Sequence, residues 1–105
     1  MNARTEWIVR MAELEIDPAR IEAYTALLAE EVETSVAKEP GVLMLHAVSV
    51  NGNPERIRIL EVYASQQDYE AHLQSPHFLK YKTLTGGMVK SLDLVEVDPI
   101  VMCAK

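Results

Sequence analysis

The stretch VLMLHAVSVNGNPERIRILEVYA, residues 42–64, decides the fold of this chain. It contains two apolar, β-branched runs, Val42 to Val50 and Ile57 to Ala64, on either side of the turn-forming segment NGNP at residues 51–54. Asn-Gly between two such runs is a strong hairpin signal, because Gly accepts the positive φ that a tight turn needs. We therefore predict two antiparallel strands joined by a connection of five or six residues.

A strand and a long helix precede this hairpin. Trp7 to Ile16 is rich in β-forming residues, whereas Pro18 to about Lys38 repeats apolar residues every three or four positions. Asp17 is a suitable N-cap, and Glu39-Pro40-Gly41 ends the helix. The expected inner face of the helix holds Ile21, Tyr24, Leu28, Val32 and Val36. The expected outer face carries four glutamates, Glu22, Glu30, Glu31 and Glu33.

Two helical pieces and a strand follow the hairpin. Ser65 is predicted to cap a short helix that ends at Leu73, and Ser75-Pro76 starts a second piece running through Phe78, Tyr81, Leu84 and Met88. Ser91 to Val101 is predicted to be the fourth strand, with Pro99 placing its end at a sheet edge. The order β-α-β-β-α-β indicates an α+β, ferredoxin-like domain with a four-stranded antiparallel sheet. We expect one domain over residues 1–105, with its core at about 7–98.

The composition limits the classes of partner. The net charge is −6 and the basic residues are scattered, so neither nucleic acid nor an anionic membrane is expected. The single cysteine, Cys103, cannot form an internal disulfide, which fits a reducing cytoplasm. No apolar signal segment is visible, and no run approaches the roughly 20 apolar residues of a membrane helix. A soluble, cytoplasmic protein is expected.

Both faces of the predicted central strands are apolar. His46 is the only ionisable residue of strand 42–50, and in the next strand Leu60 and Val62 lie on the face opposite Ile57 and Ile59. Helices can cover only one face of this sheet, and a bare apolar face of several hundred Å² favours association. We predict a homodimer that packs sheet against sheet. The alternative is a monomer with an exposed sheet face.

Several fragments resemble the antibiotic biosynthesis monooxygenase (ABM) superfamily. They are Glu39-Pro40-Gly41, LEVY at residues 60–63, YEAH at residues 69–72 and, most specific, HLQSPHFLKYK at residues 72–82. The last is similar to a segment of small bacterial proteins related to quinol monooxygenases and to the isomerase of phosphorylated autoinducer-2. The resemblance extends over about residues 7–98. It implies a dimeric α+β barrel with a cavity between sheet and helices in each protomer.

The resemblance also implies a chemistry. Several members of the superfamily oxidise electron-rich aromatic substrates such as hydroquinones with dioxygen, without metal or flavin. A substrate that forms a stabilised carbanion can pass an electron to oxygen, so the protein needs only a base, aromatic walls and a water-poor cavity. We therefore expect a cofactor-independent monooxygenase that acts on a small quinol-like or polyphenolic substrate.

The expected catalytic residues are Glu61, His72 and His77. Glu61 lies near the end of an apolar strand, where a cavity would raise its pKa and make it a base or acid. His72 and His77 flank the Ser75-Pro76 break, so that their imidazoles can meet at one cavity and accept a proton near neutral pH. The structural alternatives are helix capping for His72, a solvated His77, and an ion pair for Glu61. The candidate cations for that pair are Arg10, Arg58 and Lys82.

The expected substrate-binding residues are Tyr63, Phe78, Tyr81, His46 and Trp7. Tyr63 shares a strand face with Glu61, whereas His46, within an apolar strand, belongs either to the cavity or to the core or interface. Leu84 and Met88 are expected in the core. No metal site is expected, because no two histidines have the i, i+2 or i, i+4 spacing of a strong metal pair.

Other functions compete with the oxygenase. Haem degradation is disfavoured, since Lys82 stands where haem-degrading relatives carry the ligating His, and Tyr63 stands at their Trp. An isomerase of a small oxygen-rich carbonyl compound would use similar acid–base groups without oxygen. A small-ligand-binding dimer without catalysis is the third alternative, because the same fold hosts unrelated functions.

Overall fold

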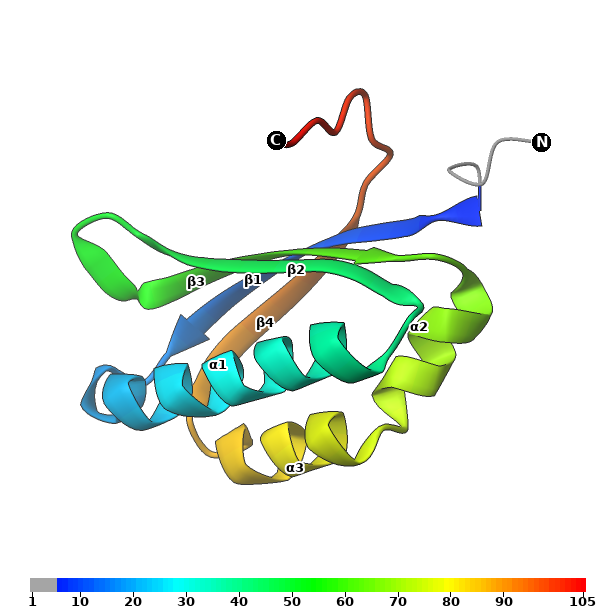
Figure 1. The fold of residues 1–105 in the computed structure, drawn as a ribbon. Helices are drawn as coiled ribbons and strands as arrows, with labels where there is room; N and C mark the ends of the chain where they lie inside the picture. The colour runs from blue at the N-terminus through cyan, green and yellow to red at the C-terminus, as the bar shows by residue number, and fades with distance from the viewer. Residues whose placement is uncertain (1–5) are drawn as a thin grey trace.

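The computed structural model describes residues 6–105. Its elements are, in order, β1 (Ile8–Ile16), η2 (Pro18–Arg20), α1 (Ile21–Lys38), β2 (Val42–Val50), β3 (Asn53–Tyr63), α2 (Gln66–Leu73), α3 (Pro76–Thr85) and β4 (Val89–Glu96). The strands form one antiparallel sheet in the order β2-β3-β1-β4. The helices lie together on one face of it (Figure 1). The predicted ferredoxin-like architecture is confirmed.

The hairpin is tighter than predicted. β3 begins at Asn53, so that two residues, Asn51 and Gly52, separate the strands instead of five or six. Gly52 has a φ of 82°, a left-handed conformation that tight turns use and that Gly adopts without strain. The short connection lets residues 53–56, which we expected to be loop, join the sheet.

Two other predicted boundaries were wrong at the C-terminal end. α3 ends at Thr85, because Gly86 and Gly87 interrupt the helix before Met88. β4 spans Val89–Glu96 rather than residues 91–101. Its pairing with β1 stops where Glu96 lies opposite Arg10, two residues inside the start of β1, and Val97 donates one last hydrogen bond to the carbonyl of Val9. β4 is an edge strand, as predicted, but Pro99 lies beyond it.

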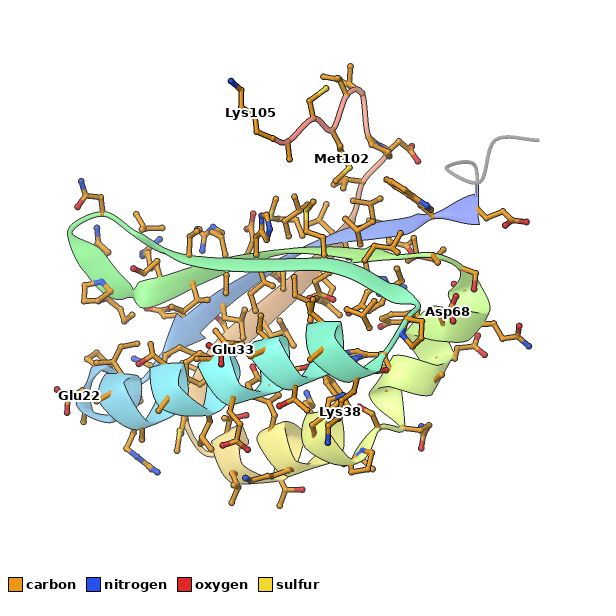
Figure 2. The ribbon with its side chains drawn as sticks, viewed as in Figure 1. Glu22, Glu33, Lys38, Asp68, Met102 and Lys105 are labelled. Atoms are coloured by element: carbon orange, nitrogen blue, oxygen red, sulfur yellow. The ribbon has the colours of Figure 1, made fainter. Side chains whose placement is uncertain are left out.

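The core lies between α1, α3 and the covered face of the sheet, where side chains fill the space between the layers (Figure 2). Within α1 the buried residues are Tyr24, Leu28, Glu31 and Ser35. The prediction for Glu31 was therefore wrong, since only 5% of it is exposed. Val36, expected inside, is 47% exposed. The buried stripe follows steps of four, three and four residues, which selects Glu31 and Ser35 over their neighbours.

The face of the sheet opposite the helices is apolar, as the sequence indicated. Met44, His46 and Val48 lie there, paired with residues 62, 60 and 58 of β3. Val48 is 60% exposed, and Val95 of β4 is 45% exposed. The alternation is interrupted at the start of β2, where a register shift between residues 42 and 44 places Val42 in the core, and a second shift lies between residues 49 and 50.

The C-terminal segment after β4 leaves the sheet on this same side, away from the helices (Figure 1), and Met102 lies on that side in Figure 2. Within this segment Ile100 is 99% exposed. Among the residues that the structure describes, no helix is both long and apolar enough to cross a membrane.

Candidate active site

A cavity of about 660 Å³ opens between the sheet and the helices. Polar and aromatic side chains of β3, α1, α2 and α3 line it. Its open side follows β4, where Leu92 and Leu94 are 42% and 48% exposed. The polar and aromatic side chains that line it are Glu31, Glu61, Tyr63, Tyr69, His72, Phe78, Tyr81, Lys82, Thr85, Lys90 and Ser91.

Glu61 and Tyr63 form a hydrogen-bonded pair in the cavity wall. They lie two residues apart on β3 and therefore point to the same face, and the Tyr63 hydroxyl donates to Glu61 Oε1 at 2.7 Å. Burial raises the pKa of Glu61, and the Tyr63 hydrogen bond and the nearby His72 and Arg10 only partly oppose this. Burial and the neighbouring Glu61 also raise the pKa of Tyr63. Glu61 is thus a carboxyl group that holds its proton at higher pH than an exposed one.

Of the three cations that we considered as ion-pair partners for Glu61, Arg10 and Arg58 pair with other carboxylates, and Lys82 lines the cavity. Arg10 forms an ion pair of 3.1 Å with Glu96, and Arg58 one of 4.0 Å with Glu13. The hydrogen bond recorded for Glu61 among residues 6–105 is the one from Tyr63. A carboxyl group in this setting is suited to proton transfer rather than to charge pairing.

His72 lies between two carboxyl groups. It is 2% exposed; its Nδ1 donates to Glu39 Oε2 at 2.9 Å, and its Nε2 lies 3.3 Å from Glu31 Oε1. Its ring packs against those of Tyr63 and Phe78, with centroids 5.3 and 4.9 Å apart. Because both nitrogens face carboxylates, His72 presents its ring to the cavity and has no nitrogen left for a substrate.

Glu31 is a second acidic group of the cavity. It accepts a hydrogen bond of 2.9 Å from Ser35 Oγ, and burial raises its pKa despite that bond. We missed Glu31 because glutamates usually mark an exposed helix face. The signal that would have found it is its position, three residues after Leu28 and seven after Tyr24 on the buried stripe.

His77 does not line the cavity. Its Nε2 donates to Glu39 Oε2 at 2.6 Å, so the two imidazoles converge as expected, but on Glu39. Burial works against ionisation of Glu39, yet the hydrogen bonds from His72 and His77 outweigh it and lower the pKa of Glu39. Glu39 follows the last residue of α1 and was not among our candidate site residues.

The aromatic candidates are partly brought together. Tyr63, Phe78 and Tyr81 line the cavity, and the Tyr81 hydroxyl shares a 2.6 Å hydrogen bond with Tyr24. The structure does not place Trp7 or His46 there.

Trp7 precedes β1 and is half-buried outside the cavity lining. His46 pairs with Leu60, and Leu60 occupies the face opposite Glu61, so His46 points away from the cavity. It borders a more open hollow of about 590 Å³ along β2 and α1, where no buried carboxyl group lies among the lining residues. Leu84 and Met88 were both expected in the core. Met88, just after α3, is 5% exposed and lies there, whereas Leu84 of α3 is 49% exposed.

Comparison with known proteins identifies the family. Residues 7–84 match the family model described as antibiotic biosynthesis monooxygenase. The chain belongs to this ABM family. No curated protein matches the chain.

Solved structures resemble this ABM protein closely. One from Bacteroides thetaiotaomicron VPI-5482, provisionally named an antibiotic biosynthesis monooxygenase, is 42% identical, with a TM-score of 0.93 and 97% of each chain covered. One from Lactobacillus acidophilus NCFM, provisionally named a monooxygenase, is 32% identical with a TM-score of 0.83; the match covers 85% of this chain and 42% of that one. One from Nitrosomonas europaea shares 19% identity with a TM-score of 0.84, over 90% and 91% of the two chains, and supports the fold alone.

The resemblance of residues 72–82 to this family has a structural basis in the ABM protein. The segment forms the junction of α2 and α3, where Ser75 Oγ donates to the His72 carbonyl at 2.7 Å and accepts from the Phe78 amide at 3.3 Å. One serine thereby ends α2 and starts α3. The junction sets the positions of His72, His77 and Phe78 together.

Proposed function

We propose that this ABM protein is a cofactor-independent monooxygenase that acts on a small quinol-like or polyphenolic substrate. The observation that carries the proposal is Glu61, a buried carboxyl group of raised pKa in the wall of an aromatic-lined cavity. Membership of the ABM family supports oxygenase chemistry. The cavity of about 660 Å³ falls within the range of small-molecule sites.

In the proposed reaction, Glu61 accepts the proton of a substrate hydroxyl. Glu61 is the best-placed base, because both nitrogens of His72 face carboxylates and His77 lies outside the cavity. The resulting anion passes an electron to dioxygen. One oxygen atom then enters the ring and the other leaves as water, so that a hydroquinone yields a hydroxyquinone. The rings of Tyr63, Phe78 and Tyr81 would orient the substrate and exclude water.

The test is oxygen consumption by the chelator-treated protein with a panel of hydroquinones. Glu61→Gln keeps the shape of the side chain but cannot take up the proton. We therefore expect its rate of oxygen consumption to be about 10²- to 10⁴-fold lower. Glu33→Gln, an exposed position of α1, is the matched control and should keep the parent rate. Full activity of Glu61→Gln, or loss of the quinol without oxygen, would contradict the proposal.

An isomerase of a small oxygen-rich carbonyl compound is the second candidate. The observation in its favour is that Lys82 and Lys90 line the cavity, where they suit an anionic substituent. Turnover of such a carbonyl compound under nitrogen, with no oxygen uptake from any quinol, would replace the oxygenase by this function.

We also propose that the protein is a homodimer formed through the apolar face of the sheet. The exposed Val48 and Val95 on that face support it, as does the ABM family, whose members are generally dimeric. Burial of this face would keep apolar side chains from water.

A further inference from the structure

We propose that Glu39, His72 and His77 bind a divalent transition-metal ion such as Zn²⁺ at the junction of α1, α2 and α3, outside the substrate cavity. One oxygen or nitrogen atom from each of the three residues lies within 4.8 Å of the others. Two imidazoles and a carboxylate are ligands that zinc accepts, with bond lengths of about 2.0 to 2.2 Å. Around a tetrahedral ion with these bond lengths the ligand atoms lie about 3.4 Å apart, so Glu39 Oε2 would move away from the two ring nitrogens, now 2.9 and 2.6 Å from it, to admit the ion.

The three ligands come from fixed backbone positions. Glu39 caps the C-terminus of α1 through a backbone hydrogen bond to Ser35, His72 lies in the last turn of α2, and His77 lies in the first turn of α3. The hydrogen bonds of Ser75 to both sides of the α2–α3 junction hold the two histidines relative to each other. A site built this way loses little conformational entropy when the metal binds.

The outer shell of a metal site is also present. In the cluster His72 turns Nδ1 toward Glu39, and its other nitrogen, Nε2, lies 3.3 Å from Glu31, which Ser35 orients by a hydrogen bond. A metal-bound histidine usually donates its second N–H to a carboxylate, which fixes the ring and strengthens it as a ligand. Glu31 stands in that position toward His72.

The geometry also explains why a cation suits the cluster. A single oxygen, Glu39 Oε2, faces both Nδ1 of His72 and Nε2 of His77, at 2.9 and 2.6 Å. Without a metal, a proton must lie in each of these contacts. One divalent ion can take the place of both protons, each of which moves to the other nitrogen of its ring or to solvent, and balance the charge of Glu39. The Glu39 and His77 side chains are 18% and 13% exposed, which leaves a route for the ion and room for a water ligand.

Of the three ligands, His72 is the one that lines the cavity. Neither Glu39 nor His77 lines the cavity, so the metal would hold the His72 ring against Tyr63 and Phe78 without meeting the substrate. This inference is independent of the proposed oxygenase function. Oxygen uptake by chelator-treated protein tests the function, whereas metal binding is measured directly.

The experiment is a titration of the chelator-treated full chain with Zn²⁺ by isothermal calorimetry. We expect one ion per chain, and a loss of affinity greater than about 100-fold in His77→Ala and in Glu39→Gln, beyond what outer-shell changes cost. Glu31→Gln should weaken binding about 10- to 100-fold, as expected of an outer-shell residue. His46→Ala and Glu33→Gln, which remove one histidine and one glutamate away from the cluster, should bind like the parent.

A measurement on the unmodified protein guards against variants that fail to fold. Histidine ring signals in NMR spectra should shift for His72 and His77 on addition of Zn²⁺, while those of His46 stay in place. Three results would overturn the proposal. They are absence of binding at 100-fold excess of Zn²⁺ over protein, binding that survives both ligand substitutions, and a shift of the His46 signals alone.

Discussion

At the scale of the residue, Glu61 links activity to stability. Its pKa is raised in the folded protein by burial, so the ionised group opposes folding at high pH and ceases to do so when protonated. We predict that Glu61→Gln increases the free energy of unfolding at pH 7 to 8, on the order of 1 kcal/mol, as single stabilising substitutions commonly do. Urea unfolding at several pH values measures this.

The sign of the pH dependence checks the cause. Stability contributed by a group with a raised folded pKa is full below its ordinary value, 4.5 for Glu61, and is lost as pH rises through the folded value. The advantage of Glu61→Gln should therefore shrink toward zero below about pH 4.5. Glu33→Gln, at an exposed position, should show no such trend. An equal gain at all pH values would mean that the amide stabilises by packing instead.

At the scale of the element, Ser75 is the residue on which the α2–α3 junction depends. Its hydroxyl bonds both the His72 carbonyl and the Phe78 amide, and it is 9% exposed. We predict that Ser75→Ala lowers the free energy of unfolding by about 1 to 3 kcal/mol, because it removes an N-cap and one of the hydrogen bonds that the buried His72 carbonyl accepts.

Ser65→Ala provides the comparison within the same pair of helices. Ser65 caps α2 through the Asp68 amide but is less buried than Ser75. Its loss should cost about 0.5 to 1 kcal/mol, the usual value of a single N-cap. Thermal or urea unfolding of the two variants side by side measures the difference. Equal losses would show that the bond to the His72 carbonyl adds nothing.

At the scale of the whole molecule, the apolar face of the sheet determines the predicted assembly. We predict that sedimentation equilibrium gives twice the mass of the chain, and that Val48→Lys shifts the protein toward the monomer. Val48 is 60% exposed on that face, so a lysine there would be tolerated in a monomer but buried in a dimer. Leu79→Lys, on α3 and 47% exposed, is the control and should stay dimeric. Dimers with Val48→Lys, or monomers of the parent chain, would contradict the sheet-to-sheet interface.

Local patterns explain how much could be predicted. Serine and proline signals located α2 and the start of α3, and period-two alternation placed Glu61 and Tyr63 on one face. The hairpin length and the end of β4 escaped prediction. The hairpin length depended on whether Gly52 alone could turn the chain. The end of β4 depended on where its pairing with β1 stops, which is at Arg10.

The sequence by itself determined the element order, the apolar second sheet face and the family, because these follow from neighbours along the chain. Only the tertiary structure decided the composition of the site. Glu39 contacts His72 and His77 across 33 and 38 residues, and Glu31 turns inward because the stripe of α1 faces that junction. No periodicity encodes such contacts. They depend on how α1, α2 and α3 pack, which is fixed only when the whole core has formed.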